Sequence, residues 1–221
     1  MSEDLIQFLT QVSIWAIPMV LAFTVHEVSH GLVARRYGDR TAEAQGRLSL
    51  NPLKHVDPIG TLLMPILALL LHIPVIGWAK PVPINPANLN NPRLDMAKVA
   101  AAGPLSNMAQ ALVWGLVLAV LQRADFPSTA STWLMAMAWA GIVVNVLFAV
   151  FNMLPIPPLD GGRVLRSFAP ARLAHALDRI EPFGFFILFG MLYAGVLDSV
   201  LGPLLRGMQH VVISLSGVQT G

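Results

Sequence analysis

Three ionisable side chains lie close together near the end of a long apolar segment, in the sequence His26-Glu27-Val28-Ser29-His30. Residues four apart in a helix share one face, so both imidazoles can reach a single zinc ion at about 2.0–2.1 Å. Glu27, beside the first histidine, can instead contact a water molecule that the metal activates. This HExxH spacing is typical of zinc hydrolases in which the glutamate is the general base. The alternative is a pair of interfacial histidines that face lipid headgroups at a helix end.

A catalytic zinc ion usually has three protein ligands and one open position, so a third ligand is required. A histidine six residues after His30 would complete a metzincin site, but that position is Arg36. The best candidate is Asp160, which follows three prolines that must end an apolar segment and precedes two glycines that permit close backbone approach. The alternative for Asp160 is a loop residue or the N-cap of a helix that begins near Arg163.

The composition indicates what must position these residues. Hydrophobic residues make up 55% of the 221 residues and charged residues 12%, about half of the roughly 25% found in soluble domains. Mean hydropathy is +0.65, so an integral membrane protein is predicted. The net charge of +2 excludes a basic nucleic-acid-binding surface. The absence of cysteine excludes cysteine-ligated zinc, iron–sulfur clusters and thiol nucleophiles.

Four segments are long and apolar enough to cross a bilayer, because about 20 helical residues at 1.5 Å each span a hydrocarbon core of about 30 Å. They are residues 5–25 (with the helix continuing to about residue 36), 99–121, 132–154 and 183–205. The fold class expected is therefore an α-helical polytopic membrane protein with about four transmembrane helices. The chain is expected to form one membrane-embedded domain over residues 1–221, with its core at about 10–180.

Residues 58–76 are uncharged, but they contain an internal proline and barely reach the length of a span. Arginine and lysine residues gather after the first and third spans, which places residues 37–57 and 159–181 on the cytoplasmic side. Two spans at 99–121 and 132–154 then require residues 77–98 to be cytoplasmic as well. Residues 37–57 and 77–98 would then lie on the same side of the membrane, so a single crossing between them does not fit. This favours a re-entrant segment or short extra helix at 58–76, although a full crossing remains the alternative.

Two shorter stretches, residues 44–50 and 78–85, are typical of strands or extended chain, and the second contains alternating prolines. We expect them to form a small membrane-associated β element. A transmembrane substrate helix must become extended before cleavage, and an exposed strand edge could bind it by strand addition.

Three motifs together resemble those of the site-2 proteases, a family of intramembrane zinc metalloproteases. The HExxH sequence at residues 26–30 matches their zinc-binding motif, and residues 152–161 match their NxxPxxxxDG motif. Residues 102–107 are similar to their GPxxN element. The motifs occur in family order, and the resemblance covers about residues 10–180. The sequences at 51–58 and 77–86 resemble the short bacterial branch of the family, which lacks a PDZ domain.

The resemblance implies that the protein hydrolyses peptide bonds in or near transmembrane segments of other membrane proteins. It implies one Zn²⁺ per chain held by His26, His30 and Asp160, with Glu27 as the catalytic acid and base. The partners implied are transmembrane protein substrates and membrane lipid, with no nucleic acid. The location expected is the bacterial cytoplasmic (inner) membrane, with the active site toward the cytoplasm.

Two amides and one further histidine have open roles. Asn107 and Asn152 lie in apolar spans, where an amide either joins helices by hydrogen bonds or contacts the substrate carbonyl and oxyanion beside zinc. We treat both as tentative substrate or oxyanion residues. His55 is either a structural loop histidine or a group near the metal.

Two other classes of protein fit the same histidines. A zinc transporter or metal sensor would bind the ion without hydrolysis, but transporters often contain repeated broken helices, which this sequence lacks. An inactive protease relative acting as a chaperone would not need the intact HExxH sequence and Asp160. The sequence leaves open the substrate and its pathway, the regulator and the oligomeric state.

Overall fold

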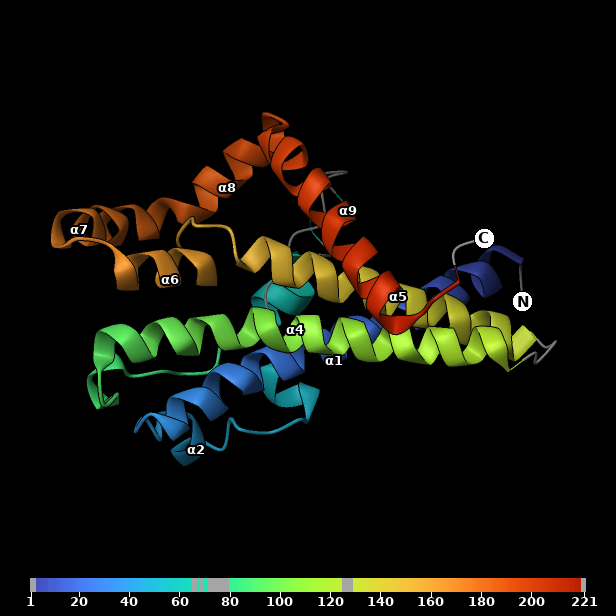
Figure 1. Cartoon of the computed structure of the whole chain (residues 1–221), viewed down its shortest axis with the longest axis horizontal. Coiled ribbons are helices and arrows are strands. Elements are labelled where there is room, and N and C mark those ends of the chain that lie inside the picture. Colours follow the sequence, from blue (N-terminus) through green and yellow to red (C-terminus); the bar gives the residue numbers. More distant parts are fainter. Residues whose placement is uncertain (1–2, 65–66, 68–69, 71–79, 125–128, 220–221) are drawn as a thin grey trace.

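The computed structural model describes residues 3–64, 67, 70, 80–124 and 129–219. Three long helices lie alongside one another: α1 (Glu3–Arg36), α4 (Pro92–Arg123) and α5 (Thr129–Asn152) (Figure 1). Each is long and apolar enough to cross a membrane, and together they confirm the first three predicted spans. Helix α4 begins seven residues before the predicted span because the Asn91 side chain accepts a hydrogen bond from the Leu94 N–H and Pro92 suits the first turn.

The centre of the molecule is α4, which packs against α1, α5, α6 and α9. Its close approach to α5 depends on Gly141, where a Cβ atom would lie 2.4 Å from the ring of Trp114. Small residues allow such contacts between membrane helices, where dispersion forces replace the hydrophobic drive of water. A continuous apolar core then joins α4, α5 and α9 through Ala111, Ile142 and Val212, each 0% exposed.

The connection from α1 to α4 contains only short helical elements among its described residues. They are α2 (Thr41–Ala44), the 3₁₀ turns η1 (Pro52–His55) and η3 (Pro86–Asn88), and the π-helical turn η2 (Pro58–Leu63). Asp39 fixes the two ends of this connection to each other: its carboxylate accepts hydrogen bonds from the N–H groups of Thr41 and Asn85 at 3.0 and 2.7 Å. Most of the segment 58–76, for which a re-entrant course was predicted, lies outside the described residues.

The predicted β element is wrong for the described part of the chain, which contains no strand. Residues 80–85 are extended, but Pro81 and Pro83 have no N–H group and cannot join a β ladder. The N–H groups of Lys80, Val82 and Asn85 donate instead to a backbone carbonyl and to two carboxylates. At the other stretch, Ala44 ends α2 and residues 45–50 are irregular, while residues 78 and 79 lie outside the described part.

After α5 the chain forms α6 (Asp160–Phe168), α7 (Ala171–Ile180), the 3₁₀ turn η4 (Glu181–Phe183), α8 (Gly184–Tyr193) and α9 (Val196–Ser216). The predicted span at 183–205 is therefore divided. Gly195 adopts a left-handed conformation with φ of 69°, which ends α8. The stretch Ala171–Tyr193 and α9 meet at 84°, and α9 crosses over α4 and α5 (Figure 1). The described residues thus contain three spanning helices, or four if this bent pair counts as one.

Candidate metal centre

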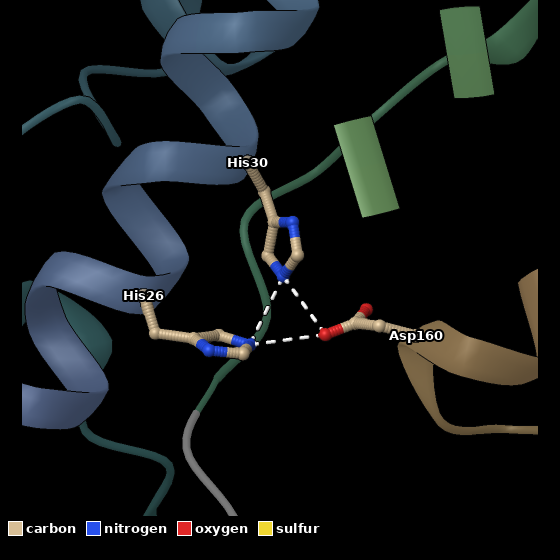
Figure 2. A group of neighbouring side chains, drawn as sticks. All are labelled: His26, His30 and Asp160. Atoms are coloured by element: carbon tan, nitrogen blue, oxygen red, sulfur yellow. Dashed lines mark hydrogen bonds and ion pairs between the residues drawn. The ribbon is translucent and has the colours of Figure 1, made fainter. Parts of the chain in front are cut away.

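Three predicted ligands from distant parts of the chain meet at one point. His26 and His30 lie on consecutive turns of α1, and Asp160 is the first residue of α6 (Figure 2). The two Nε2 atoms are 3.0 Å apart, and they lie 3.2 and 3.3 Å from Oδ2 of Asp160. All three residues are buried, with exposed fractions of 5–7%. Among the described residues, no other group of three such side chains converges in this way.

The hydrogen bonds behind the histidines determine which ring nitrogen faces the centre. Nδ1 of His30 contacts the main-chain oxygen of Val99 at 2.7 Å, and Nδ1 of His26 contacts Oδ1 of Asn107 at 2.6 Å. The Asn107 oxygen is identified by its own NH₂ group, which donates to the main-chain oxygen of Ala22 at 3.2 Å. Oxygen atoms of amides only accept, so both Nδ1 atoms carry the proton. In the neutral imidazoles, each Nε2 therefore presents a lone pair to the centre.

Asp160 adds an anionic oxygen to these two lone pairs. Its Oδ2 atom is buried and has no hydrogen-bond donor among the described residues. Three electron-pair donors about 3 Å apart repel one another unless a positive charge lies among them. The three side chains could thus hold a metal ion among them.

The dimensions and chemistry of the centre fit zinc. A tetrahedral zinc ion with bonds of about 2.0–2.1 Å separates its ligand atoms by about 3.3 Å, and the three observed separations are 3.0–3.3 Å. Two imidazoles and one carboxylate are ligands that zinc accepts. Three protein ligands leave a fourth tetrahedral position for water or substrate, as in catalytic rather than structural zinc sites.

Helix α4 leaves room for the ion at Gly103. A Cβ atom on this residue would lie 2.5 Å from Nε2 of His30 and 2.6 Å from Nε2 of His26. Any side chain here would therefore occupy the space into which the lone pairs point. The glycine serves the metal centre as well as helix packing.

The loop at residues 153–159 carries the chain from α5 to Asp160. It folds back on the first turn of α6, where Cβ atoms on Gly161 and Gly162 would lie 2.3 Å from the Met153 oxygen and 2.5 Å from the Pro157 nitrogen. The N-cap position of α6 is occupied by the residue before Asp160, and no side chain caps the helix. The structure therefore gives Asp160 no capping role.

The predicted catalytic carboxylate is held by the extended segment described above. Oε2 of Glu27 accepts a hydrogen bond from the Val82 N–H at 2.7 Å, and Glu27 is half-buried. Val82 also packs near α1, because a Cβ atom on Gly31 would lie 3.0 Å from the Val82 side chain. The segment 80–85 therefore lies beside the turn of α1 that carries the HExxH sequence.

The remaining predicted residues lie apart from the three ligand atoms. Asn152 is the last residue of α5, and its NH₂ group donates to the Phe148 oxygen at 3.0 Å. Nε2 of His55 contacts the Ser49 oxygen at 2.8 Å. Asn107 reaches the centre only through its hydrogen bond to His26. The catalytic and oxyanion roles of these residues stay predictions.

Sequence reasoning missed three features of the centre. Gly103 was noted as part of the GPxxN-like sequence at residues 102–107, with no role at the metal. Asn145, whose side-chain oxygen accepts a hydrogen bond from the NH₂ group of Asn107 at 3.0 Å, was not predicted, although an amide in the middle of an apolar span was an available signal. The hydrogen bond from Val82 to Glu27 uses a backbone group, so no side chain in the sequence could have signalled it.

Comparisons with known proteins identify the class of protein. Residues 124–194 match the family described as "Peptidase family M50". A Bacillus subtilis protein described as "Putative zinc metalloprotease YwhC" is 37% identical over 203 residues, which cover 90% of this chain and 89% of the relative. Rip2 of Mycolicibacterium smegmatis, with the same description, is 30% identical over 179 residues, covering 81% of this chain and 66% of the relative. No solved structure matches the chain significantly.

The chain therefore belongs to peptidase family M50, the site-2 protease family. It is a zinc metalloprotease. Its long apolar helices and its family make it an integral membrane protein.

Proposed function

We propose that this chain, as a single domain, is an intramembrane endopeptidase that hydrolyses peptide bonds in or near transmembrane segments of other membrane proteins. The observation that carries the proposal is the position of the ligand set. Two buried histidines and a buried carboxylate converge among helices that are apolar enough to span a bilayer. Ionisable groups are costly in such surroundings and are usually kept for function. A peptide bond that reaches this centre must therefore come from within or beside the membrane.

The proposed roles follow from the chemistry of each side chain. His26, His30 and Asp160 hold the zinc ion, which when bound polarises the scissile carbonyl and acidifies a water molecule. Glu27 accepts the proton of that water as it attacks and passes it to the leaving nitrogen. The Val82 N–H orients the Glu27 carboxylate by binding one of its two oxygens.

Asn152 is the proposed contact for the substrate carbonyl or the oxyanion. It lies at the junction between α5 and the loop that leads to Asp160. Its NH₂ group now bonds to the carbonyl four residues earlier in its own helix, and a substrate oxygen can replace that acceptor. Asn107 keeps a substrate role only as an alternative, because its described hydrogen bonds are made inside the protein.

The substitution Glu27→Gln tests the proposal. We expect purified Glu27→Gln protein to keep close to one zinc per chain, because the glutamate is not a ligand, while cleavage of a transmembrane substrate falls below detection. Zinc content and cleavage are measured on the same preparation, with His30→Ala as the control that loses both. Undiminished cleavage by Glu27→Gln would remove Glu27 from the mechanism. A wild-type protein that binds zinc without cleaving any transmembrane substrate would favour the metal sensor or transporter.

We further propose that the chain lies in the bacterial cytoplasmic membrane with its active site toward the cytoplasm. Arg35 and Arg36 lie in the last turn of α1, at the end that carries the histidines, and Arg40 follows it. The positive-inside rule places this end in the cytoplasm. Cysteines introduced at positions 40 and 170 should react with reagents from the cytoplasmic side, and a cysteine at position 124 from the other side. Labelling of positions 40 and 124 from the same side would contradict this orientation.

A further inference from the structure

Two amide side chains, Asn107 of α4 and Asn145 of α5, are 0% exposed and lie behind His26. We propose that they form a directional hydrogen-bond relay that holds His26 in the tautomer whose Nε2 lone pair faces the metal. Asn145 is then a positioning residue of the metal centre, although it contacts none of the three ligands. The inference rests on the proposed zinc site, and the experiment below separates the two.

The relay runs through three hydrogen bonds that cross from α5 to α1. The NH₂ group of Asn145 donates to the main-chain oxygen of Gly141 at 2.9 Å. The Asn145 oxygen accepts from the NH₂ group of Asn107 at 3.0 Å. The Asn107 oxygen then accepts from Nδ1 of His26 at 2.6 Å. The NH₂ group of Asn107 also donates to the Ala22 oxygen at 3.2 Å, which holds the same amide against α1.

Each amide in the relay can point only one way. A main-chain carbonyl cannot donate, so the Gly141 oxygen requires the NH₂ group of Asn145 and turns the Asn145 oxygen toward Asn107. A reversed Asn107 would place its oxygen against the oxygens of Asn145 and Ala22 and its NH₂ group against Nδ1 of His26. Two oxygen–oxygen repulsions in a fully buried site oppose this reversal. The direction set at Gly141 is thereby passed to His26.

The second histidine shows why the first one needs a relay. Nδ1 of His30 donates to the main-chain oxygen of Val99, a group with no alternative orientation. Nδ1 of His26 donates instead to a side-chain amide, which could rotate and offer either an acceptor or a donor. The fixed orientation of Asn107 gives His26 a constant hydrogen-bond acceptor, as the Val99 carbonyl gives His30. Partners of this kind, which orient a metal-bound histidine, typically change metal affinity by about 10–100-fold when removed.

The experiment measures zinc affinity of the purified full-length protein by competition with a chelator, and the tautomer of His26 by ¹⁵N-histidine NMR of the zinc-free protein. Both are done at a pH above the ordinary histidine pKa of about 6.5. We expect Asn107→Leu to weaken zinc binding by about 10–100-fold and Asn145→Leu by about tenfold, since the Ala22 oxygen still restrains Asn107. Both variants should show a mixed His26 tautomer. Val146→Ala, a buried apolar truncation next to Asn145, is the control and should leave both readouts unchanged.

A double-mutant cycle distinguishes positioning from general loss of packing. Asn107→Asp should recover part of the affinity lost in Asn107→Leu, because a carboxylate oxygen always accepts from Nδ1 of His26, although its second oxygen faces the oxygens of Asn145 and Ala22. Adding Asn145→Leu to Asn107→Asp should then cost no further affinity. An equal loss from Asn145→Leu in both backgrounds would overturn the relay and leave Asn145 a packing residue. Unchanged zinc affinity and tautomer in Asn145→Leu would also overturn it. Absence of zinc binding by the wild-type protein would instead overturn the proposed metal site.

Discussion

The metal centre has two halves that are built differently. The histidine half consists of packed helices: His26 and His30 lie on α1, and groups of α4 fix both rings from behind. The carboxylate half depends on two irregular segments, residues 80–85 and 153–159. The first binds Glu27 through a backbone N–H, and the second carries the chain to Asp160.

This difference concerns how firmly each group of the site is held. In the histidine half, helix periodicity sets the spacing of the ligands, so the geometry changes only if whole helices move. In the carboxylate half, single hydrogen bonds and close glycine contacts hold each group. Substitutions in the two halves should therefore affect zinc affinity and cleavage to different extents.

The largest effect is expected from Gly103→Ala in the histidine half. The added methyl group would lie about 2.5 Å from both Nε2 atoms, and packed helices cannot yield by an ångström without losing other contacts. We expect zinc affinity to fall by more than about 100-fold, beyond the range for outer partners of a ligand, and cleavage to disappear. Gly115→Ala is the control: it is equally crowded on the same helix, against Ser216. Equal zinc loss in both variants would point to misfolding of α4.

In the carboxylate half, Asp160→Asn should have the next largest effect. The amide keeps the size of the side chain but replaces an anionic ligand by a neutral one. We expect much weaker zinc binding and almost no cleavage from a protein that is still inserted in the membrane. Excess zinc should restore part of the metal content and little of the activity. Wild-type affinity together with near wild-type cleavage would remove Asp160 from the site and make His55 the next residue to test.

The hydrogen bond to Glu27 should affect catalysis without affecting the metal. Val82→Pro removes the N–H donor in a segment already flanked by prolines, while Val82→Ala keeps it. We expect Val82→Pro to lower kcat by about tenfold, a fraction of the roughly 10²–10⁴-fold that a general base contributes, with zinc content unchanged and Val82→Ala close to wild type. Equal losses in the two variants would assign the effect to the valine side chain rather than to its N–H.

The smallest effect should come from Arg163, a partly exposed residue beside Asp160 in the carboxylate half. The Arg163 guanidinium lies 3.9 Å from Oδ1 of Asp160, and its side chain is 42% exposed. Exposed ion pairs contribute about 0–1 kcal/mol, so Arg163→Gln should change zinc affinity by less than about fivefold. A chelator titration of the variant beside the wild-type protein measures it. A loss as large as that of Asp160→Asn would show that Arg163 orients the carboxylate.

Much of the fold could be predicted because apolar length is a local property. The helices α1, α4 and α5 follow from uninterrupted apolar segments, and their spans were predicted to within a few residues except for the start of α4. The break at Gly195 and the absence of strands in the described residues were not predicted. The conformations of a left-handed glycine and of a proline-rich extended segment depend on contacts with residues far away in the sequence. Residues 80–85, for example, form hydrogen bonds to the carboxylates of Glu27 and Asp39 where a β ladder was expected.

The sequence by itself determined that the two histidines share one face of a helix, and so predicted them as a metal-binding pair, because a spacing of four residues places both on one face of any helix. The residue types also suggested Glu27 as the general base and Asp160 as the best third ligand, and the resemblance to the site-2 proteases strengthened both predictions. Only the tertiary structure decided that Asp160 meets the histidines at about 3 Å, that Gly103 leaves the space in front of their Nε2 atoms open, and that hydrogen bonds join Asn145 to His26 through Asn107. These features depend on how α1, α4, α5 and α6 pack together, and distances between separate helices are set by their side-chain contacts rather than by local periodicity.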